Sequence, residues 1–243
     1  MPTHTLQDWF TTPLGQYLLE KEQAYLDDVI PDIFGFHALQ VGLSQFDLLR
    51  ASRIAHRVRV DSTSHPDLYA KSHELPVATQ SVDLVVLSHA LEFAAQPHEI
   101  LREVDRVMMP EGRLVIVGFN PWSLWGLRSS LVSRGDFPWN GRFVSLPRVK
   151  DWLALLGFDV NAGRLVGYAP PFDSDNVRRR FGFMEPAGDR WWAVGGAVYM
   201  LQAIKRVRGM RLLTPAWAAQ KDAREKALAA AKRQSVSHLK VVK

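Results

Sequence analysis

The sequence predicts an α/β fold built around a mostly parallel sheet. Continuous apolar runs begin at residues 82 and 113 (VDLVVLS and RLVIVGF), which is typical of strands buried on both faces. Between them, residues 97–110 (PHEILREVDRVMMP) carry apolar side chains at the spacing of one helix face. Buried strands that alternate with amphipathic helices indicate βαβ units, whose right-handed connections place helices on both faces of the sheet.

The same alternation extends from residue 13 to about residue 208. We expect helices at 13–30, 45–52 and 146–156, and further strands at 37–43, 53–61, 158–170 and 197–207. Pro31 should end the first helix and Gly157 the last, while Pro110, Glu111 and Gly112 should form a turn. These patterns divide the chain into a helical segment (1–34), an α/β domain (35–208) and a tail (209–243).

Composition excludes several classes of protein. The 243 residues include no cysteine, so neither a disulfide framework nor a thiolate metal site can form, and we expect a reducing, cytoplasmic location. The eight histidines show no metal-ligand spacing, and we expect no metal. The first residues lack the pattern of a signal peptide, and the longest apolar stretch, 191–204, is short for a membrane span.

Charge is distributed unevenly along the chain. Residues 1–201 hold 19 Lys and Arg against 23 Asp and Glu, whereas residues 202–243 hold 11 against two. The basic tail could contact a nucleic acid or an anionic surface, or it could be a solvated extension, which we favour. The sequence leaves the oligomeric state open.

Residues 74–121 contain the most informative motifs. The segments LPVATQSVDLV and EVDRVMMPEGRLVI, and the later strand AVYMLQAIKRV, occur in the order found in class I S-adenosylmethionine-dependent methyltransferases. The sequence resembles this family, and most closely the group that includes the ubiquinone biosynthesis methyltransferases. It is also similar to a bacterial branch of methyltransferase-domain proteins through GFNPWSLWGLR and WFTTPLGQYLLEKE.

The resemblance implies a Rossmann-like, seven-stranded sheet with one antiparallel strand, and methyl transfer from S-adenosylmethionine to a small molecule, with S-adenosylhomocysteine as product. The turn Gly42, Leu43 and Ser44 would lie beside the methionine part of the cofactor, and Asp61 would bind the ribose hydroxyls. A carboxylate suits this role because it offers several acceptor sites. The other implied cofactor contacts are Ser72, His73, Glu74 and Leu75 beside adenine, and Ser88 and His89 near the sulfonium.

The first turn departs from the family's pattern of an acid followed by spaced glycines. Gln40 replaces the acid, and Ser44 and Phe46 occupy the next two glycine positions after Gly42. Glycine at such positions permits a close approach of the backbone to a ligand, and Phe46 would add bulk unless it turns into the core. The departure motivates an alternative: a non-catalytic protein with the methyltransferase fold that binds partners through its surface or tail.

Two further groups are candidates for chemistry. His89 and Glu92, just after a strand, could be an acid–base pair, or a satisfied strand-end residue and a helix-start acid. Asn120, Trp122 and Trp125 could line a substrate mouth, or the tryptophans could pack a helix onto the sheet. For Arg178–Arg180 and Trp191–Trp192 we favour a solvated face and packing, respectively.

Overall fold

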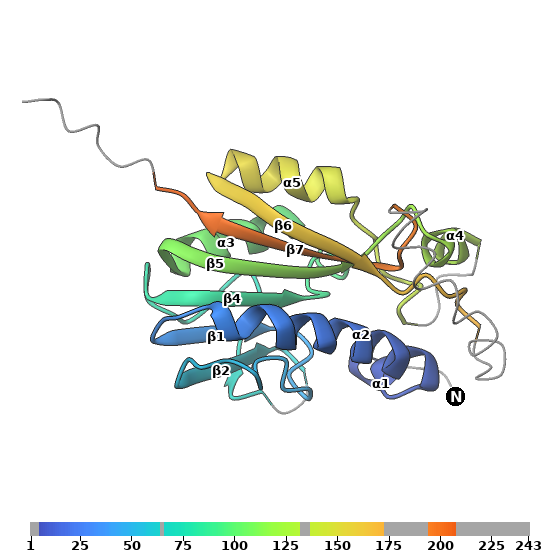
Figure 1. The fold of residues 1–243 in the computed structure, drawn as a ribbon, viewed down its shortest axis with the longest axis horizontal. Helices are drawn as coiled ribbons and strands as arrows, with labels where there is room; N and C mark the ends of the chain where they lie inside the picture. The colour runs from blue at the N-terminus through green and yellow to red at the C-terminus, as the bar shows by residue number, and fades with distance from the viewer. Residues whose placement is uncertain (1–4, 64–65, 132–136, 173–193, 208–243) are drawn as a thin grey trace, which may run out of the picture. The chain divides into compact units, whose positions relative to one another are not determined.

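A computed structural model describes residues 5–63, 66–131, 137–172 and 194–207 of the chain. Its centre is one seven-stranded sheet in the order β3-β2-β1-β4-β5-β7-β6. The strands are β1 (His37–Val41), β2 (His56–Asp61), β3 (Leu68–Tyr69), β4 (Val82–Ser88), β5 (Met108–Phe119), β6 (Phe158–Val166) and β7 (Val198–Lys205). Strand β7 is antiparallel to both of its neighbours, β5 and β6, and its arrow points opposite to those of β4 and β5 in Figure 1. The predicted fold class is therefore confirmed.

Helices cover both faces of this sheet. The helices are α1 (Leu6–Phe10), α2 (Pro13–Val29), α3 (Pro97–Val107), α4 (Leu124–Leu131) and α5 (Leu146–Leu155), and a short 3-10 turn, η1 (Ile30–Asp32), follows α2. In Figure 1, α2 lies in front of the sheet and α3 lies behind it. None of the helices in the described ranges is long and apolar enough to cross a membrane.

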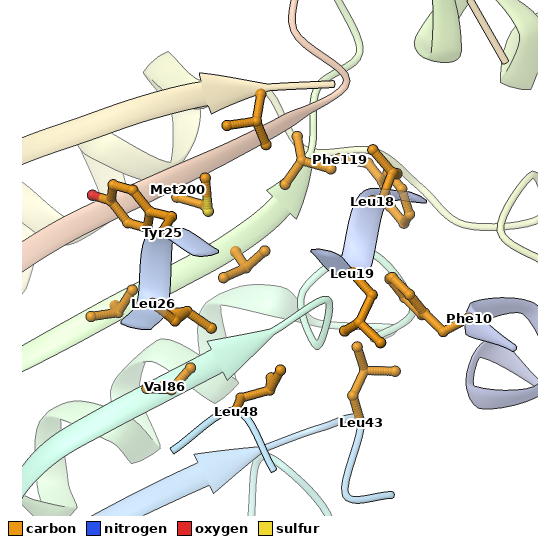
Figure 2. Close-up of a cluster of buried hydrophobic side chains, with 14 of the residues drawn as sticks. Phe10, Leu18, Leu19, Tyr25, Leu26, Leu43, Leu48, Val86, Phe119 and Met200 are labelled. Carbon is orange, nitrogen blue, oxygen red and sulfur yellow. The ribbon is translucent and has the colours of Figure 1, made fainter. Parts of the chain in front are cut away.

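The strand residues alternate between two hydrophobic clusters. Leu84 and Val86 of β4 face a first cluster with the apolar side of α2, which Figure 2 shows in close-up. Val85 and Leu87 face a second cluster, which contains the apolar sides of α3 and α5. Burial on both faces explains why β4 reads as a continuous apolar run in the sequence.

Two local predictions were wrong. Residues 45–52 form turns instead of a helix, with short-range bonds such as that from the Ser52 N–H to the Leu49 carbonyl. Gln40 holds this segment in its turned form, as shown below. Pro110, Glu111 and Gly112 lie within β5. Met108 pairs with Val82, and pairing with β4 resumes at Arg113 after a register shift.

The chain order of the strands locates a ligand-binding edge. From β1 the chain proceeds outward through β2 and β3, then returns to place β4 on the other side of β1. In open α/β sheets, ligands bind beyond the carboxyl ends of the strands at such a switch point. In Figure 1, α1 lies at the end toward which β1, β2 and β4 point.

Candidate functional site

A cavity of about 570 Å³ opens at the switch point. Its walls include Gly42 and Leu43 after β1, Asp61 at the end of β2, and Ser88 and His89 at the end of β4. Residues 5–7 at the start of α1 and residues 93–96, before α3, also contribute to the lining. The volume lies within the roughly 300–1,000 Å³ typical of small-molecule sites.

The turn after β1 is shaped by two residues with positive φ angles. Gly42 has φ 88°, and a Cβ atom there would lie 2.4 Å from the Ser88 carbonyl oxygen, so only glycine fits between the two strand ends. Leu43 has φ 49°, which is unusual for a leucine. Its side chain is fully buried in the first cluster, which stabilises this backbone conformation (Figure 2). His89 also has φ 49°, so the strained residues meet at one edge of the cavity.

Gln40 holds this turn closed from inside. Its buried side-chain amide donates hydrogen bonds to the carbonyls of Gly42, Leu43 and Phe46 at 3.1, 3.1 and 2.9 Å. Its oxygen accepts from the Leu48 N–H at 3.1 Å. An acid at this position could accept that bond but could not donate to the three carbonyls. Gln40 therefore stands where the family has an acid, and the turn directs three carbonyls toward its side-chain amide.

Phe46 does not block the cavity. Its ring packs on the first cluster, with its centroid 6.3 Å from that of Phe10, and it is absent from the residues that line the cavity. Ser44 is fully buried behind the lining, where its backbone N–H donates to Asp61 at 3.3 Å. The two residues that replace glycines thus leave the space beside Gly42 and Leu43 open.

Asp61 is held by four donors from the described residues. Its Oδ2 accepts from the Gln7 side chain at 2.7 Å and from the Ser44 N–H at 3.3 Å. Its Oδ1 accepts from the Thr63 N–H at 3.1 Å and from the Thr63 hydroxyl at 2.9 Å. Gln7 also donates to the Thr63 hydroxyl at 2.9 Å, so α1 is joined to the end of β2 by a connected network. We name these three residues, Gln7, Asp61 and Thr63, the Asp61 network.

A second network lies deeper in the molecule. The Nε2 of His89 is 3.0 Å from the Oε1 of Glu22 on α2, and its Nδ1 is 3.4 Å from the Oε1 of Glu92. Glu92 Oε1 also accepts from the Phe119 N–H at 2.6 Å. All three side chains have zero exposure. We name Glu22, His89 and Glu92 the His89 network.

Electrostatics keep the imidazole of this network charged. Burial alone would lower the pKa of His89, but the carboxylates of Glu22 and Glu92 outweigh burial and raise that pKa to about 9. Burial, followed by the charge of Glu92, raises the pKa of the Tyr199 phenol well above its usual value. The Nε2 of His89 has Glu22 as its hydrogen-bond partner, whereas its Nδ1 lies 3.4 Å from Glu92 without a hydrogen bond to any described residue. With its pKa raised to about 9, the ring is protonated near neutral pH and has no lone pair with which to act as a base. The geometry favours a structural ion cluster over an acid–base pair.

The structure separates the predicted cofactor contacts into two groups. Ser72 and His73 line the cavity together with the turn and strand-end residues named above. Glu74 and Leu75 lie outside its lining: Leu75 packs in the second cluster and its N–H donates to Glu103 at 2.8 Å.

The residues predicted to contact the methyl acceptor are not among those that line the cavity. Trp125 is buried in the first cluster and donates to the Ala169 carbonyl at 2.9 Å. The Asn120 amide donates to the Val194 and Gly196 carbonyls, which closes the loop before β7. Trp122 is 72% exposed. Packing thus accounts for Trp125, which is the alternative stated above, and the lining does not support a substrate mouth at these residues.

Three residues of the two networks, Gln7, Glu22 and Thr63, were not predicted from the sequence. Glu22 lies four residues from Leu18 and Leu26, so an acid occupies the apolar stripe of α2, and this misplaced charge was the available signal. Gln7 lies in a five-residue helix that carries no comparable signal. The segments Arg178–Arg180 and Trp191–Trp192 and the tail 209–243 lie outside the described residues.

Comparison with known proteins agrees with this geometry. Residues 43–116 match a family described as a methyltransferase domain. A Thermotoga maritima structure described as a methyltransferase dependent on S-adenosylmethionine, possible histamine N-methyltransferase, superposes with a TM-score of 0.61 at 15% identity, covering 82% of this chain and 93% of that one. An Archaeoglobus fulgidus methyltransferase gives 0.54 at 21% identity, covering 78% and 99%. Residues 43–116 therefore match a methyltransferase domain, and the chain has the fold of these solved methyltransferases. S-adenosylmethionine is the cofactor that such a domain implies.

Curated relatives extend the match along the sequence. The Escherichia coli protein YafS is 39% identical over 155 residues, which cover 63% of this chain and 65% of YafS. A malonyl-[acyl-carrier protein] O-methyltransferase of Halorhodospira halophila is 35% identical over 89 residues, or 37% of this chain and 30% of that protein. The chain thus spans just under two thirds of YafS and a smaller part of the second relative.

The residues of the methyltransferase domain fit the implied cofactor. Gly42 presents bare backbone at the cavity, and Asp61 places a carboxylate on the same wall. The buried hydroxyl of Ser88 makes no hydrogen bond to any described residue, and Ser88 also lines the cavity. An unpaired buried hydroxyl in a cavity wall is a polar group available to a ligand.

Proposed function

We propose that this chain transfers a methyl group from S-adenosylmethionine to a small-molecule acceptor. One observation carries the proposal: the cavity at the switch point has Gly42 and Asp61 on its wall, while Phe46 is turned away from it. In the sequence, Phe46 at a position where the family has glycine was the strongest argument that the site is closed. Its position in the structure supports an open one.

The chain's own contribution would be binding and alignment. Asp61 would accept hydrogen bonds from the ribose hydroxyls, and the turn at Gly42 and Leu43 would support the methionine part. The cofactor supplies a methyl group activated by a positively charged sulfur. A reaction of this kind needs mainly orientation and exclusion of water, which agrees with the lack of a free base on His89.

The acceptor would enter beside the aromatic part of the cavity. Phe93 and Phe137 both line it, and their ring centroids are 5.2 Å apart. Similar proteins act on different acceptors according to their names, so the acceptor stays open. The absence of cysteine supports a cytoplasmic location, and the likeness to YafS supports a bacterial source.

Titration calorimetry with S-adenosylmethionine and S-adenosylhomocysteine tests the proposal. We expect saturable binding of both to the full chain, weakened at least about tenfold by Asp61→Ala, since a lost charged hydrogen bond costs about 1.5–3 kcal/mol. Absence of binding at millimolar ligand would reject the proposal. The alternative of a non-catalytic fold that acts through its surface or tail would then stand.

A further inference from the structure

The Asp61 network raises a question that rests on the proposed function: how ribose reaches a carboxylate that already has partners. A carboxylate has about four acceptor positions on its two oxygens. Gln7, Ser44 and Thr63 supply four hydrogen bonds to Asp61, two on each oxygen. A ribose diol can therefore bind Asp61 only by replacing donors that the chain itself provides.

The four donors differ in their freedom to move. Two are backbone N–H groups. One belongs to Ser44, in the turn that Gln40 holds by hydrogen bonds, and the other to Thr63, two residues after Asp61. The other two are side-chain groups, the Gln7 amide and the Thr63 hydroxyl, and each bonds a different oxygen of Asp61. Rotation of a side chain releases these without moving the backbone. They also bond each other at 2.9 Å, so they form a pair of adjacent polar groups across the carboxylate.

We propose that the Gln7 amide and the Thr63 hydroxyl occupy the positions of the two ribose hydroxyls on Asp61, and that cofactor binding exchanges them for the ribose diol. Gln7 is thus a residue that limits cofactor affinity, although it lies on an N-terminal helix outside the matched methyltransferase domain. Its amide satisfies Asp61 in the free protein and must be released on binding.

The exchange does not require α1 to move. Trp9 and Phe10 anchor this helix: their side chains are 4% and 0% exposed and pack in the first cluster. The ring of Trp9 makes edge contacts with Phe119 and Trp125, with centroids 6.0 and 6.2 Å apart. The Gln45 amide also donates to the Gln7 carbonyl at 3.0 Å. The helix therefore stays in place, and only the end of the Gln7 side chain turns away from Asp61.

Binding of S-adenosylhomocysteine to three variants of the full chain tests this exchange. Gln7→Ala and Thr63→Val each remove one competing donor, and we expect each to bind about three- to tenfold more tightly than the wild type. The weakest net hydrogen bonds to a charged group correspond to about tenfold, which sets the upper end of this range. Thr63→Ser keeps the hydroxyl and serves as the matched control, with an expected change below about twofold. Thermal unfolding without ligand verifies that each variant is folded.

The outcomes separate this inference from the proposed function. Weaker or unchanged binding in both Gln7→Ala and Thr63→Val, with a wild type that binds, overturns the exchange and leaves the methyltransferase proposal intact. Tighter binding by both variants than by a wild type that itself binds supports the exchange. Loss of binding in every protein, all of them folded, overturns both.

Discussion

The Asp61 network and the His89 network both contribute to the cavity lining at the same edge of the sheet, but they differ in the exposure of their side chains. Asp61 is half-buried on the cavity wall, and two of its four bonds come from side chains that can rotate. The His89 network has no exposed side chain, and both nitrogens of its imidazole face carboxylates. The Asp61 network can therefore exchange side-chain donors, whereas the His89 network is enclosed by protein.

The difference shows what burial does to a polar group. A fully buried charge is stabilised only by its partners, so the loss of one partner leaves an uncompensated charge. A group at a cavity wall can exchange a protein donor for a ligand or for water. We therefore assign stability to the His89 network and cofactor binding to the Asp61 network.

Removal of His89 should have the largest effect. His89→Ala leaves Glu22 and Glu92 buried without their cation, and we expect the free energy of unfolding to fall by about 3–5 kcal/mol. Urea denaturation at pH 6 measures this. The exposed His98 provides the control, and His98→Ala should change stability by less than about 0.5 kcal/mol. A similar small change in both variants would refute the assignment.

The pH dependence of stability should report the same network. The folded pKa of His89 is about 9, above its usual value of 6.5, so its contribution to stability is complete below about pH 6.5 and is lost as the pH rises to 9. The shift corresponds to about 3 kcal/mol across this range. Unfolding measured at intervals from pH 6 to 10 should show the decline in wild type and not in His89→Gln. Parallel curves for the two proteins would contradict the assignment.

A substitution at Gln40 measures how much a buried, uncharged polar side chain contributes to stability. Gln40→Glu keeps the size of the side chain but removes its donors from three carbonyls, and we expect a loss of about 2–3 kcal/mol in unfolding free energy. Gln80→Glu, at an exposed glutamine, is the control for the same chemical change. Equal stability of the two variants would show that the turn does not depend on Gln40.

Asp61 should show the smallest effect on stability. Because the carboxylate is only half-buried, Asp61→Asn should lower the free energy of unfolding by less than about 1 kcal/mol. The same change should weaken binding of S-adenosylhomocysteine strongly, since an amide accepts fewer hydrogen bonds. A loss of several kcal/mol would place Asp61 with His89 among the structural groups.

The sequence predicted the sheet and its main helices because each carries a clear periodic pattern. It failed at residues 45–52, where Leu48 and Leu49 suggest a helix face but the hydrogen bonds of Gln40 hold turns instead. It predicted that Asp61 ends a strand and that Gly42 follows one, and both residues line the cavity. It could not locate Gln7, which is 54 residues from Asp61 in the sequence. In the fold, the Gln7 side-chain nitrogen lies 2.7 Å from a carboxylate oxygen of Asp61.

A crystal structure of the full chain with S-adenosylhomocysteine tests the central claim most directly. We predict ribose hydroxyls within hydrogen-bond distance of Asp61, the Gln7 amide turned away from it, and His89 still between Glu22 and Glu92. A ribose bound elsewhere, or an imidazole that has left its carboxylates to face the ligand, would contradict the division between a closed structural network and an open binding network.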